Sequence, residues 1–465
     1  MTLITSISGI RGTIGGKPGE GLTPMDIVKF SAAFGRWVID TTGIKKIVIG
    51  RDARISGQMV NNLVIGTLQS IGIDVIDLGL STTPTVEIAV PDQQAGGGII
   101  LTASHNPGHW NALKLLNYKG EFISGEEGQK VLELAEETNW DFAAVDELGK
   151  VTTDDSYMQK HIDQILALPL VDVLAVKRRN LKVVVDCVNS SGGIFVPPLL
   201  NAMGIYEIDV LYGEPNGDFQ HNPEPLPENL VALSKQVIAT GAHLGIAVDP
   251  DVDRLCFVNQ DGSMFGEEYT LVAIADYILQ HTPGNTVSNL SSTRALSDVT
   301  VRLGCNYAAA AVGEVNVVTK MKETNAVIGG EGNGGIIYPE LHYGRDALVG
   351  IALFLSYFVK TGKTMSQLKD SYPQYYMSKN KIELTEDLDL DLLLKMIKGK
   401  YDTYPCNTVD GLKIDFEKGW VHLRKSNTEP IIRIYAEADS EDTVNQLVEK
   451  VKTAVQLILP AKSIA

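Results

Sequence analysis

The chain has 465 residues, more than one ordinary hydrophobic core contains, so we expect three or four domains. Its 57 acidic residues outnumber the 40 Lys and Arg, and the net charge of −17 argues against a general nucleic-acid-binding role. The four cysteines form no CxxC pair, and the chain shows neither a signal-peptide pattern nor a run of about 18 apolar residues. We therefore expect a cytoplasmic protein with no nucleic acid and no membrane as partner.

The first 150 residues alternate helix and strand patterns. Thr23 followed by Pro24 is typical of a helix start, and apolar residues recur behind them at helical spacing. Because strands and helices alternate, the sequence predicts a mostly parallel sheet covered by helices. The further predicted elements of this region are a helix over 59–72 and strands over 45–52, 73–79 and 97–103.

The same alternation recurs in two further units, each of about 100 residues. Their predicted helices span 229–241, 268–281 and 346–362, and their predicted strands lie within 181–193, 243–254, 285–291, 307–313 and 325–335.

From about residue 375 the pattern changes to antiparallel strands with two helices, which indicates a small α+β domain. Its predicted strands are 380–385, 411–416, 420–426 and 431–438, and its predicted helices are 389–400 and 442–459. We therefore predict an α/β fold with three similar mixed α/β domains, over 1–150, 151–255 and 256–370, and a C-terminal α+β domain over 371–465.

Three acidic residues, Asp249, Asp251 and Asp253, alternate at the end of a predicted strand. Carboxylates that converge in one loop suit a hard cation such as Mg²⁺. The EF-hand pattern is excluded, because Arg254 and Gln260 stand where that motif needs Gly and Glu. A solvated acidic turn is the alternative, but charges at the mouth of a buried strand usually face a crevice.

Two further loops carry polar residues suited to a ligand. In "GEGNGG", Glu331 and Asn333 are placed to hydrogen-bond sugar hydroxyls, and the glycine spacing excludes a dinucleotide fingerprint. In "RKSNTEPIIR", arginines and small polar residues form a candidate oxyanion cradle. Its candidate phosphate-binding residues are Arg424, Ser426, Asn427, Thr428 and Arg433. For either loop, an ordinary polar turn is the alternative.

The segment "TASHNP" ends an apolar run and presents Ser104 beside His105. The lipase-type G-x-S-x-G motif is absent, and the sequence assigns no His/Asp pair to Ser104. One phosphate chemistry would use all four segments. A phosphoryl group carried on a serine beside a divalent cation would be transferred to a sugar hydroxyl.

Together these motifs resemble those of the α-D-phosphohexomutase family, in the same order along essentially the whole chain. The serine loop matches at Thr102 to Pro107, the metal loop at Asp249 to Arg254, the sugar loop at Gly330 to Gly334 and the phosphate loop at Arg424 to Pro430. "SGIRG" (8–12) and "GRDARISG" (50–57) resemble further family segments. The resemblance implies four domains around a central cleft, with a C-terminal domain that closes on the substrate.

The resemblance also implies a chemistry. Ser104 is phosphorylated in the active enzyme, and its phosphate and Asp249, Asp251 and Asp253 hold Mg²⁺. The phosphoryl group moves to a hexose monophosphate and gives a hexose 1,6-bisphosphate, which serves as intermediate and activator. Lys114, His105, Arg11 and Arg254 are the candidates for acid–base catalysis or phosphoserine contact. We expect a monomer or a homodimer, and a hinge near 365–378.

The chain departs from the family pattern at three places that bear on the substrate. Gly335 stands where many bacterial members have His, Glu314 where His or Lys is frequent, and Lys425 where Pro is usual. Glu314 could meet an amino group on the sugar, which favours glucosamine phosphate. Glucose and mannose phosphates are the alternatives. A phosphatase with water as acceptor and a non-catalytic sugar-phosphate sensor are the rival interpretations.

Overall fold

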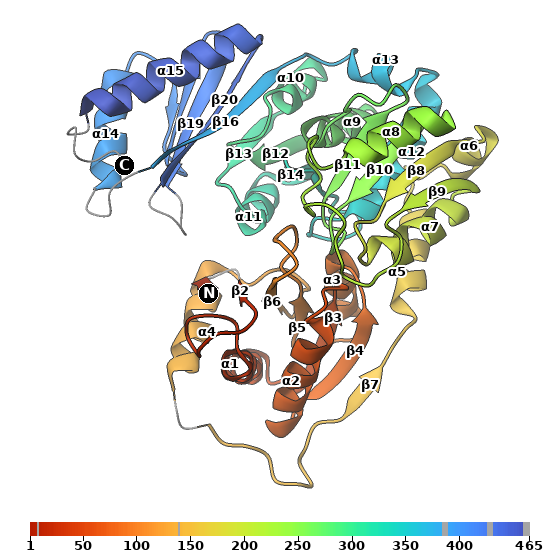
Figure 1. Cartoon of the computed structure of the whole chain (residues 1–465), viewed down its shortest axis with the longest axis vertical. Coiled ribbons are helices and arrows are strands. Elements are labelled where there is room, and N and C mark those ends of the chain that lie inside the picture. Colours follow the sequence, from red (N-terminus) through yellow and green to blue (C-terminus); the bar gives the residue numbers. More distant parts are fainter. Residues whose placement is uncertain (7–8, 138–139, 384–388, 426–430, 459–465) are drawn as a thin grey trace.

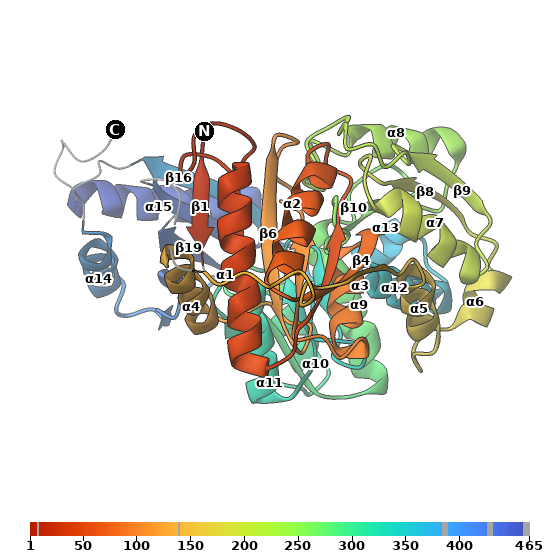
Figure 2. The same cartoon turned by 90° about the horizontal axis from the view of Figure 1, so that it is seen from below.

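The computed structural model contains four β-sheets, each with its own helices (Figure 1). It describes residues 1–6, 9–137, 140–383, 389–425 and 431–458. Seen from below, the first sheet and α1 lie in the middle, between the C-terminal sheet at one end and the second sheet at the other (Figure 2). Among the described residues, none of the helices combines the length and the apolarity that a membrane span requires.

The first sheet has seven strands in the order β1-β2-β6-β5-β3-β4-β7. The predicted helix after Thr23 is confirmed, because α1 begins at Pro24 and Thr23 is its N-cap. The strands are β1 Leu3–Ser6, β2 Gly9–Thr13, β3 Lys46–Arg51, β4 Asp74–Leu80, β5 Gly97–Leu101, β6 Trp110–Asn117 and β7 Val151–Thr153. The helices are α1 Pro24–Thr42, α2 Gly57–Ser70, α3 Thr83–Asp92 and α4 Gly125–Glu136.

The second and third sheets each have four strands, in the orders β11-β10-β8-β9 and β13-β12-β14-β15. The second contains β8 Lys182–Asp186, β9 Glu207–Leu211, β10 Leu244–Val248 and β11 Leu255–Asn259, with α5 Tyr157–Leu166, α6 Val173–Arg178, α7 Gly192–Ala202 and α8 Val231–Thr240. The third contains β12 Asn285–Asn289, β13 Tyr307–Ala310, β14 Ala326–Glu331 and β15 Gly335–Ile337, with α9 Glu267–His281, α10 Ala295–Arg302, α11 Glu314–Thr324, α12 Ala347–Thr361 and α13 Met365–Lys369.

One four-strand arrangement occurs in all three sheets. The strands concerned are β3 to β6 in the first sheet, β8 to β11 in the second and β12 to β15 in the third. Counted in chain order within each set, the first strand lies between the second and the third, and the fourth pairs antiparallel with the third. The first three strands are parallel in each case. The expectation of three similar mixed α/β units is thus confirmed. The first sheet includes β7 (Val151–Thr153) and the second includes β11 (Leu255–Asn259), so both sheets extend past the predicted domain boundaries at 150 and 255. Those boundaries stay predictions.

The C-terminal domain is the predicted α+β unit, with five antiparallel strands in the order β16-β20-β19-β18-β17. Helices α14 and α15 pack beside this sheet (Figure 1). Its elements are β16 Tyr376–Glu383, α14 Leu390–Lys400, β17 Cys406–Asn407, β18 Leu412–Phe416, β19 Gly419–Lys425, β20 Ile431–Ala438 and α15 Glu441–Ile458.

The hydrophobic clusters divide the chain differently from the sheets. One cluster joins the second and third domains and runs from Ile162 to Tyr372. The C-terminal domain has a separate cluster around Ile434. Its contacts with the third domain include polar pairs, such as Ser291 with His422 at 2.9 Å and Lys413 Nζ donating to Leu290 O at 3.0 Å.

The expected hinge segment is fixed over most of its length. Met365, Leu368 and Tyr372 are buried in the cluster that the second and third domains share. The Tyr372 hydroxyl donates to Asp276, and that of Tyr375 donates to Asp298 at 2.6 Å. These contacts favour a pivot after Tyr375, and the hinge near 365–378 stays a prediction.

Because the C-terminal domain has its own apolar core, we predict that it unfolds in a separate transition. Ile434→Ala should lower its stability by about 2–5 kcal/mol and leave the transition of the other domains unchanged. Ile351→Ala, an equally buried change in the shared cluster, should do the reverse. Scanning calorimetry measures both transitions. A single transition that both substitutions shift alike would contradict the prediction.

Candidate active site

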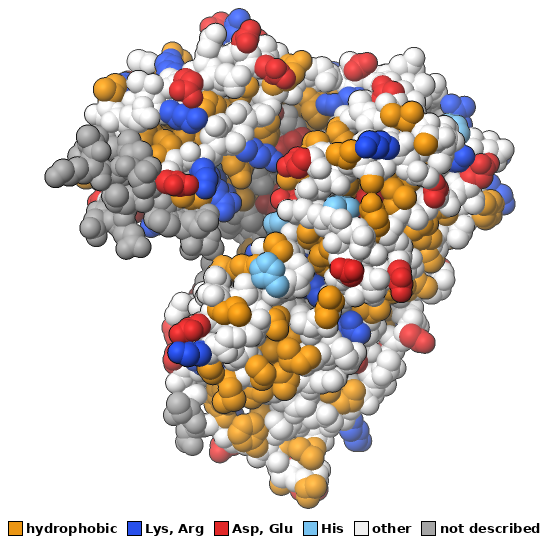
Figure 3. Space-filling view, in the orientation of Figure 1, with side chains coloured by type: hydrophobic (Ala, Val, Ile, Leu, Met, Phe, Trp, Pro, Cys, Tyr) orange, Lys and Arg blue, Asp and Glu red, His pale blue; other side chains and the backbone are white. Residues whose placement is uncertain are grey.

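Three predicted loops occupy the same position in the repeated arrangement, between the third and the fourth strand. The serine loop joins β5 to β6, the metal loop joins β10 to β11, and the sugar loop joins β14 to β15. They meet at a cavity of about 660 Å³. Described residues of all four domains line it, among them His105, Arg254, Glu331 and Arg424. Figure 3 shows the surface hollowed between the first domain and the domains above it.

Ser104 is held by its backbone and by its side chain. It is a non-glycine residue with φ of 48°, in the left-handed region, which is strained for a serine. Its N–H donates to Thr102 Oγ1 at 2.9 Å, and its hydroxyl donates to Asp249 Oδ2 at 2.7 Å. His105 Nδ1 lies 3.4 Å from the same hydroxyl. The serine loop of the first domain thus touches the metal loop of the second.

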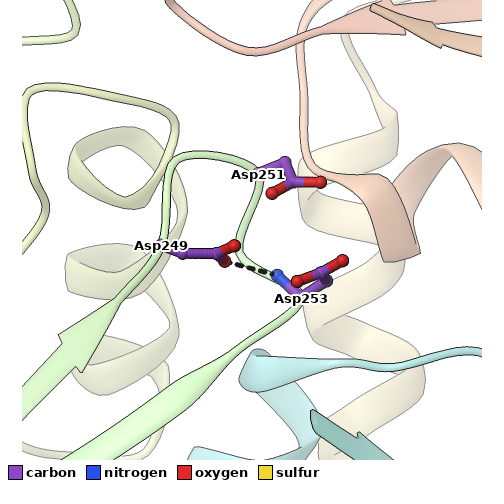
Figure 4. Close-up of side chains that lie close together, drawn as sticks. All are labelled: Asp249, Asp251 and Asp253. Atoms are coloured by element: carbon purple, nitrogen blue, oxygen red, sulfur yellow. Dashed lines mark hydrogen bonds between the residues drawn. The ribbon is translucent and has the colours of Figure 1, made fainter. Parts of the chain in front are cut away.

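The three metal-loop aspartates are fully buried, and their ligand atoms lie within 4.8 Å of one another (Figure 4). Asp249 Oδ1 accepts from the N–H of Asp253 at 3.1 Å. Asp251 Oδ1 and Asp253 Oδ1 are buried and have no hydrogen-bond partner among the described residues. A buried oxygen left unpaired is costly, and carboxylate oxygens are the donors that a hard divalent cation prefers. This donor set therefore fits a cation such as Mg²⁺.

The aspartates differ in their proton affinity. Burial and the neighbouring carboxylates of Asp253 and Asp251 hold the pKa of Asp249 well above its ordinary value. Burial alone would raise the pKa of Asp251 too, but the ammonium of Lys114 outweighs it and lowers that pKa. Lys114 Nζ donates to Asp251 Oδ2 at 2.6 Å and to Asp253 Oδ2 at 3.3 Å.

The other predicted catalytic residues surround Ser104. Arg11 and Arg254 line the cavity with His105, whereas Lys114 lies buried against the aspartates. Arg11 Nη1 donates to Asn106 Oδ1 at 3.3 Å. Burial, helped by the positive charges of Arg254 and Arg11, lowers the pKa of His105 well below its ordinary value. The protonated form of His105 is therefore disfavoured.

Glu331 and Asn333, the predicted sugar-binding residues, both line the cavity. Glu331 Oε1 accepts from Asn289 Nδ2 at 2.8 Å and from the N–H of Gly313 at 3.0 Å. Asn333 Oδ1 accepts from the N–H of Gly335 at 3.2 Å. A Cβ at Gly334, where φ is 86°, would lie 2.2 Å from Leu255 O. Glycine is therefore required for this loop to pack against the end of the metal loop.

The phosphate loop joins β19 to β20 in the C-terminal domain. Arg424 and Arg433 line the cavity, and the predicted phosphate-binding residues Ser426, Asn427 and Thr428 lie outside the described residues. Arg424 Nε pairs with Asp410 Oδ2 at 2.7 Å. The same oxygen accepts from the N–H of Val312 in the third domain at 3.0 Å. The side chain of Arg424 is thus tied across the domain boundary.

The comparisons with known proteins agree with this architecture. Models of the phosphoglucomutase/phosphomannomutase domains match the chain from end to end: α/β/α domain I at 3–141, domain II at 159–262, domain III at 266–376 and the C-terminal domain at 381–454. The chain belongs to the phosphoglucomutase/phosphomannomutase family. It is accordingly an enzyme of the phosphomutase class, as the sequence motifs predict.

Relatives of the family cover nearly the whole chain. A phosphoglucomutase/phosphomannomutase of Thermococcus kodakarensis is 36% identical over 94% of this chain and 96% of its own length. A probable phosphoglucosamine mutase of Methanopyrus kandleri is 33% identical over 95% of each. The crystal structure of a family protein from Burkholderia thailandensis superposes with a TM-score of 0.86 at 26% identity, covering 98% of both chains.

Arg345 is a site residue that the sequence motifs do not reveal. Its buried guanidinium donates to Asp253 at 2.7 Å, to Glu314 at 2.9 Å and to Glu331 at 3.1 Å. It therefore links the metal loop to the sugar loop. Its position directly before a strongly apolar helix is the sequence signal that could have drawn attention to it.

The contacts of Arg345 change the interpretation of Glu314 and Gly335, two positions at which the chain departs from the family pattern. Glu314 Oε1 accepts from the N–H of Arg345 at 2.9 Å, and Oε2 accepts from its guanidinium. Glu314 does not line the cavity, so its contacts do not support the expected role beside a sugar amino group. A Cβ at Gly335 would lie 2.3 Å from Arg345 Cδ, which explains why no histidine fits at that position in this chain.

The left-handed backbone at Ser104 gives a prediction about stability. Ser104→Gly and Ser104→Ala both lose the hydroxyl, but only glycine relieves the positive φ. We expect the glycine variant to be more stable than the alanine variant by about 1 kcal/mol in chemical unfolding. At Ala103, where φ is not positive, Ala103→Gly should instead destabilise. Equal stability of the two Ser104 variants would show that the conformation carries no strain.

Proposed function

We propose that this enzyme interconverts a hexose 6-phosphate and a hexose 1-phosphate, with Ser104 as the phosphoryl carrier and a hexose 1,6-bisphosphate as the intermediate. The observation that carries the proposal is the 2.7 Å hydrogen bond from Ser104 Oγ to Asp249, beside a cavity that all four domains line. A hydroxyl so close to a cation-binding carboxylate suits a phosphoryl acceptor. The same atom would donate the group in the next half-reaction.

The metal loop would hold Mg²⁺ through Asp249, Asp251 and Asp253, together with an oxygen of the phosphorylated Ser104. Bound Mg²⁺ would neutralise charge on the phosphoryl group during transfer. Asp249 also fixes the direction of the Ser104 hydroxyl by accepting its hydrogen bond. Lys114 keeps the remaining negative charge of the loop balanced through Asp251 and Asp253.

The remaining loops would bind the parts of the substrate that do not react. Arg424 and Arg433 line the cavity from the C-terminal domain. Together with Ser426, Asn427 and Thr428 they would bind the phosphate that is not reacting. Glu331 and Asn333 would accept hydrogen bonds from sugar hydroxyls. Because the intermediate carries two phosphates, either one can occupy the arginine site while the other faces Ser104.

Acid–base help would come from groups close to the carrier. His105 lines the cavity 3.4 Å from Ser104 Oγ and is within reach of its proton, although its lowered pKa makes it a weak base. Arg11 and Arg254 also line the cavity and would contact the phosphoryl oxygens. Lys114 would act indirectly, through Asp251 and Asp253, which it contacts. The base itself stays open among these candidates.

For the sugar we propose glucosamine phosphate first, and glucose or mannose phosphate as the alternative. The Methanopyrus relative is named for glucosamine, whereas the slightly more similar Thermococcus relative is named for glucose and mannose. Isomerisation rates with the three hexose 6-phosphates, each primed with the matching 1,6-bisphosphate, measure the preference. Phosphate release without isomerisation would point to a phosphatase instead.

We predict that Asp249→Ala, Asp251→Ala and Asp253→Ala each weaken Mg²⁺ binding by more than tenfold and abolish turnover, because each removes one hard ligand. Titration calorimetry with Mg²⁺ and the unphosphorylated protein measures the affinity. Glu224→Ala is the control, since this carboxylate lines the same cavity but pairs with Arg254 at 3.2 Å. Parental affinity in all three aspartate variants would refute the metal assignment.

We predict that Ser104→Ala abolishes isomerisation while the folded state changes in stability by no more than about 1 kcal/mol. Mass spectrometry of the parent should find one phosphate on the peptide that contains Ser104, and its occupancy should rise with added hexose 1,6-bisphosphate. Ser81→Ala, at a buried serine after β4 in the same domain, is the control and should keep activity. Mutase activity in the Ser104→Ala variant would overturn the carrier role.

A further inference from the structure

One arginine that does not line the cavity, Arg54, supports the serine loop. Arg54 follows β3 in the turn before α2 and is 1% exposed. A guanidinium has five N–H donors. Here Nε donates to Asp52 Oδ2 at 3.0 Å, Nη1 to Pro107 O at 2.8 Å and Trp110 O at 3.0 Å, and Nη2 to Asn106 O at 2.6 Å and to Ser104 O. Every donor is used, and four of the five acceptors are carbonyls: three in the serine loop and that of Trp110, the first residue of β6.

A buried carboxylate completes the support. Asp52 Oδ2 also accepts from Thr102 Oγ1 at 2.6 Å, and Asp52 Oδ1 accepts from the N–H of Arg54 at 3.0 Å. Thr102 Oγ1 in turn accepts from the N–H of Ser104. The contacts therefore fix Ser104 at its carbonyl through Arg54, at its N–H through Thr102 and at its hydroxyl through Asp249.

This support explains how a strained conformation persists. The left-handed φ of Ser104 costs about 1–3 kcal/mol and survives only when its surroundings determine it. Arg54 binds the carbonyls on both sides of the turn, so it resists relaxation of that backbone. The centroid of the Phe219 ring, from the second domain, lies 5.1 Å from the guanidinium carbon.

We propose that Arg54 is the positioning residue of the phosphoryl carrier: by binding three carbonyls of the serine loop and that of Trp110 at the start of β6, it keeps Ser104 Oγ in line for transfer. This inference rests on the proposed carrier role of Ser104. Arg54 touches neither the cavity nor the metal loop, so it acts through the loop alone. Lysine keeps the charge opposite Asp52 but has a single nitrogen, which cannot reach the four carbonyls together.

The test compares Arg54→Lys with Arg51→Lys. Arg51 lies at the end of the same strand, but its hydrogen bonds go to Asp52 O and to Gln58. A displacement of about 1 Å at a reacting atom costs about 100-fold in rate. We therefore expect Arg54→Lys to lower kcat, and the rate at which hexose 1,6-bisphosphate phosphorylates Ser104, by about 100-fold. KM and the Mg²⁺ affinity should stay close to parental values, and Arg51→Lys should match the parent.

Other outcomes are distinguishable. If the parent never takes phosphate on Ser104, the proposed function fails and not this inference alone. If the parent is phosphorylated and Arg54→Lys is phosphorylated at the same rate, Arg54 does not position the carrier. Equal loss of Mg²⁺ affinity, KM and kcat would indicate a purely structural role and overturn the proposal. Should Arg54→Lys fail to fold, Thr102→Val breaks the same support at the Ser104 N–H and must show the selective loss of kcat.

Discussion

Three carboxylates buried in one short loop are the constraint that the rest of the site must satisfy. Burying uncompensated charge is costly, so the loop needs cations and donors close by. The second domain supplies the aspartates, but Lys114 comes from the first domain and Arg345 from the third. The hydroxyl of Thr83, in the first domain, also donates to Asp251 Oδ2 at 2.6 Å, and the N–H of Thr83 donates to the backbone carbonyl of Asp251 at 2.9 Å. The partners of this one loop thus come from the first and the third domain.

The repeated strand arrangement explains how these loops come to meet. In each of the first three domains the site loop joins a parallel strand to the antiparallel strand beside it. The carboxyl ends of the parallel strands face the same crevice, as is general for open α/β sheets. One structural position therefore carries three different tasks: a hydroxyl in the first domain, carboxylates in the second, and a glycine-rich sugar loop in the third.

Much of this arrangement could be predicted from the sequence, because its signals are local. Apolar periodicity identified the helices and strands to within a few residues, as at α9 (Glu267–His281) and β20 (Ile431–Ala438). The loops were visible because polar residues such as Asp249 and Ser104 follow apolar runs. The family resemblance supplied the roles that those residues are proposed to have.

What the sequence could not provide are the partners that come from distant segments. Nothing near Glu314 reveals that Arg345 occupies both of its oxygens, and nothing near Arg54 reveals four carbonyls some fifty residues away. The same holds for the segment 365–378, near which a hinge is predicted. Nothing in "MSQLKDSYPQYYMS" reveals that Tyr372 and Tyr375 find hydrogen-bond partners on α9 and α10.

The location of these partners along the chain also has a consequence for biosynthesis. Domains generally fold as units and in order of synthesis. The side-chain hydrogen bonds of Arg54, Asp52 and Thr102 all lie within the first domain, whose sheet is complete once β7 pairs with β4. The serine loop can therefore take its shape while later domains are still being synthesised. The metal loop cannot, because Arg345 is synthesised only near the end of the third domain. Until then Asp253 lacks the guanidinium that pairs with its carboxylate.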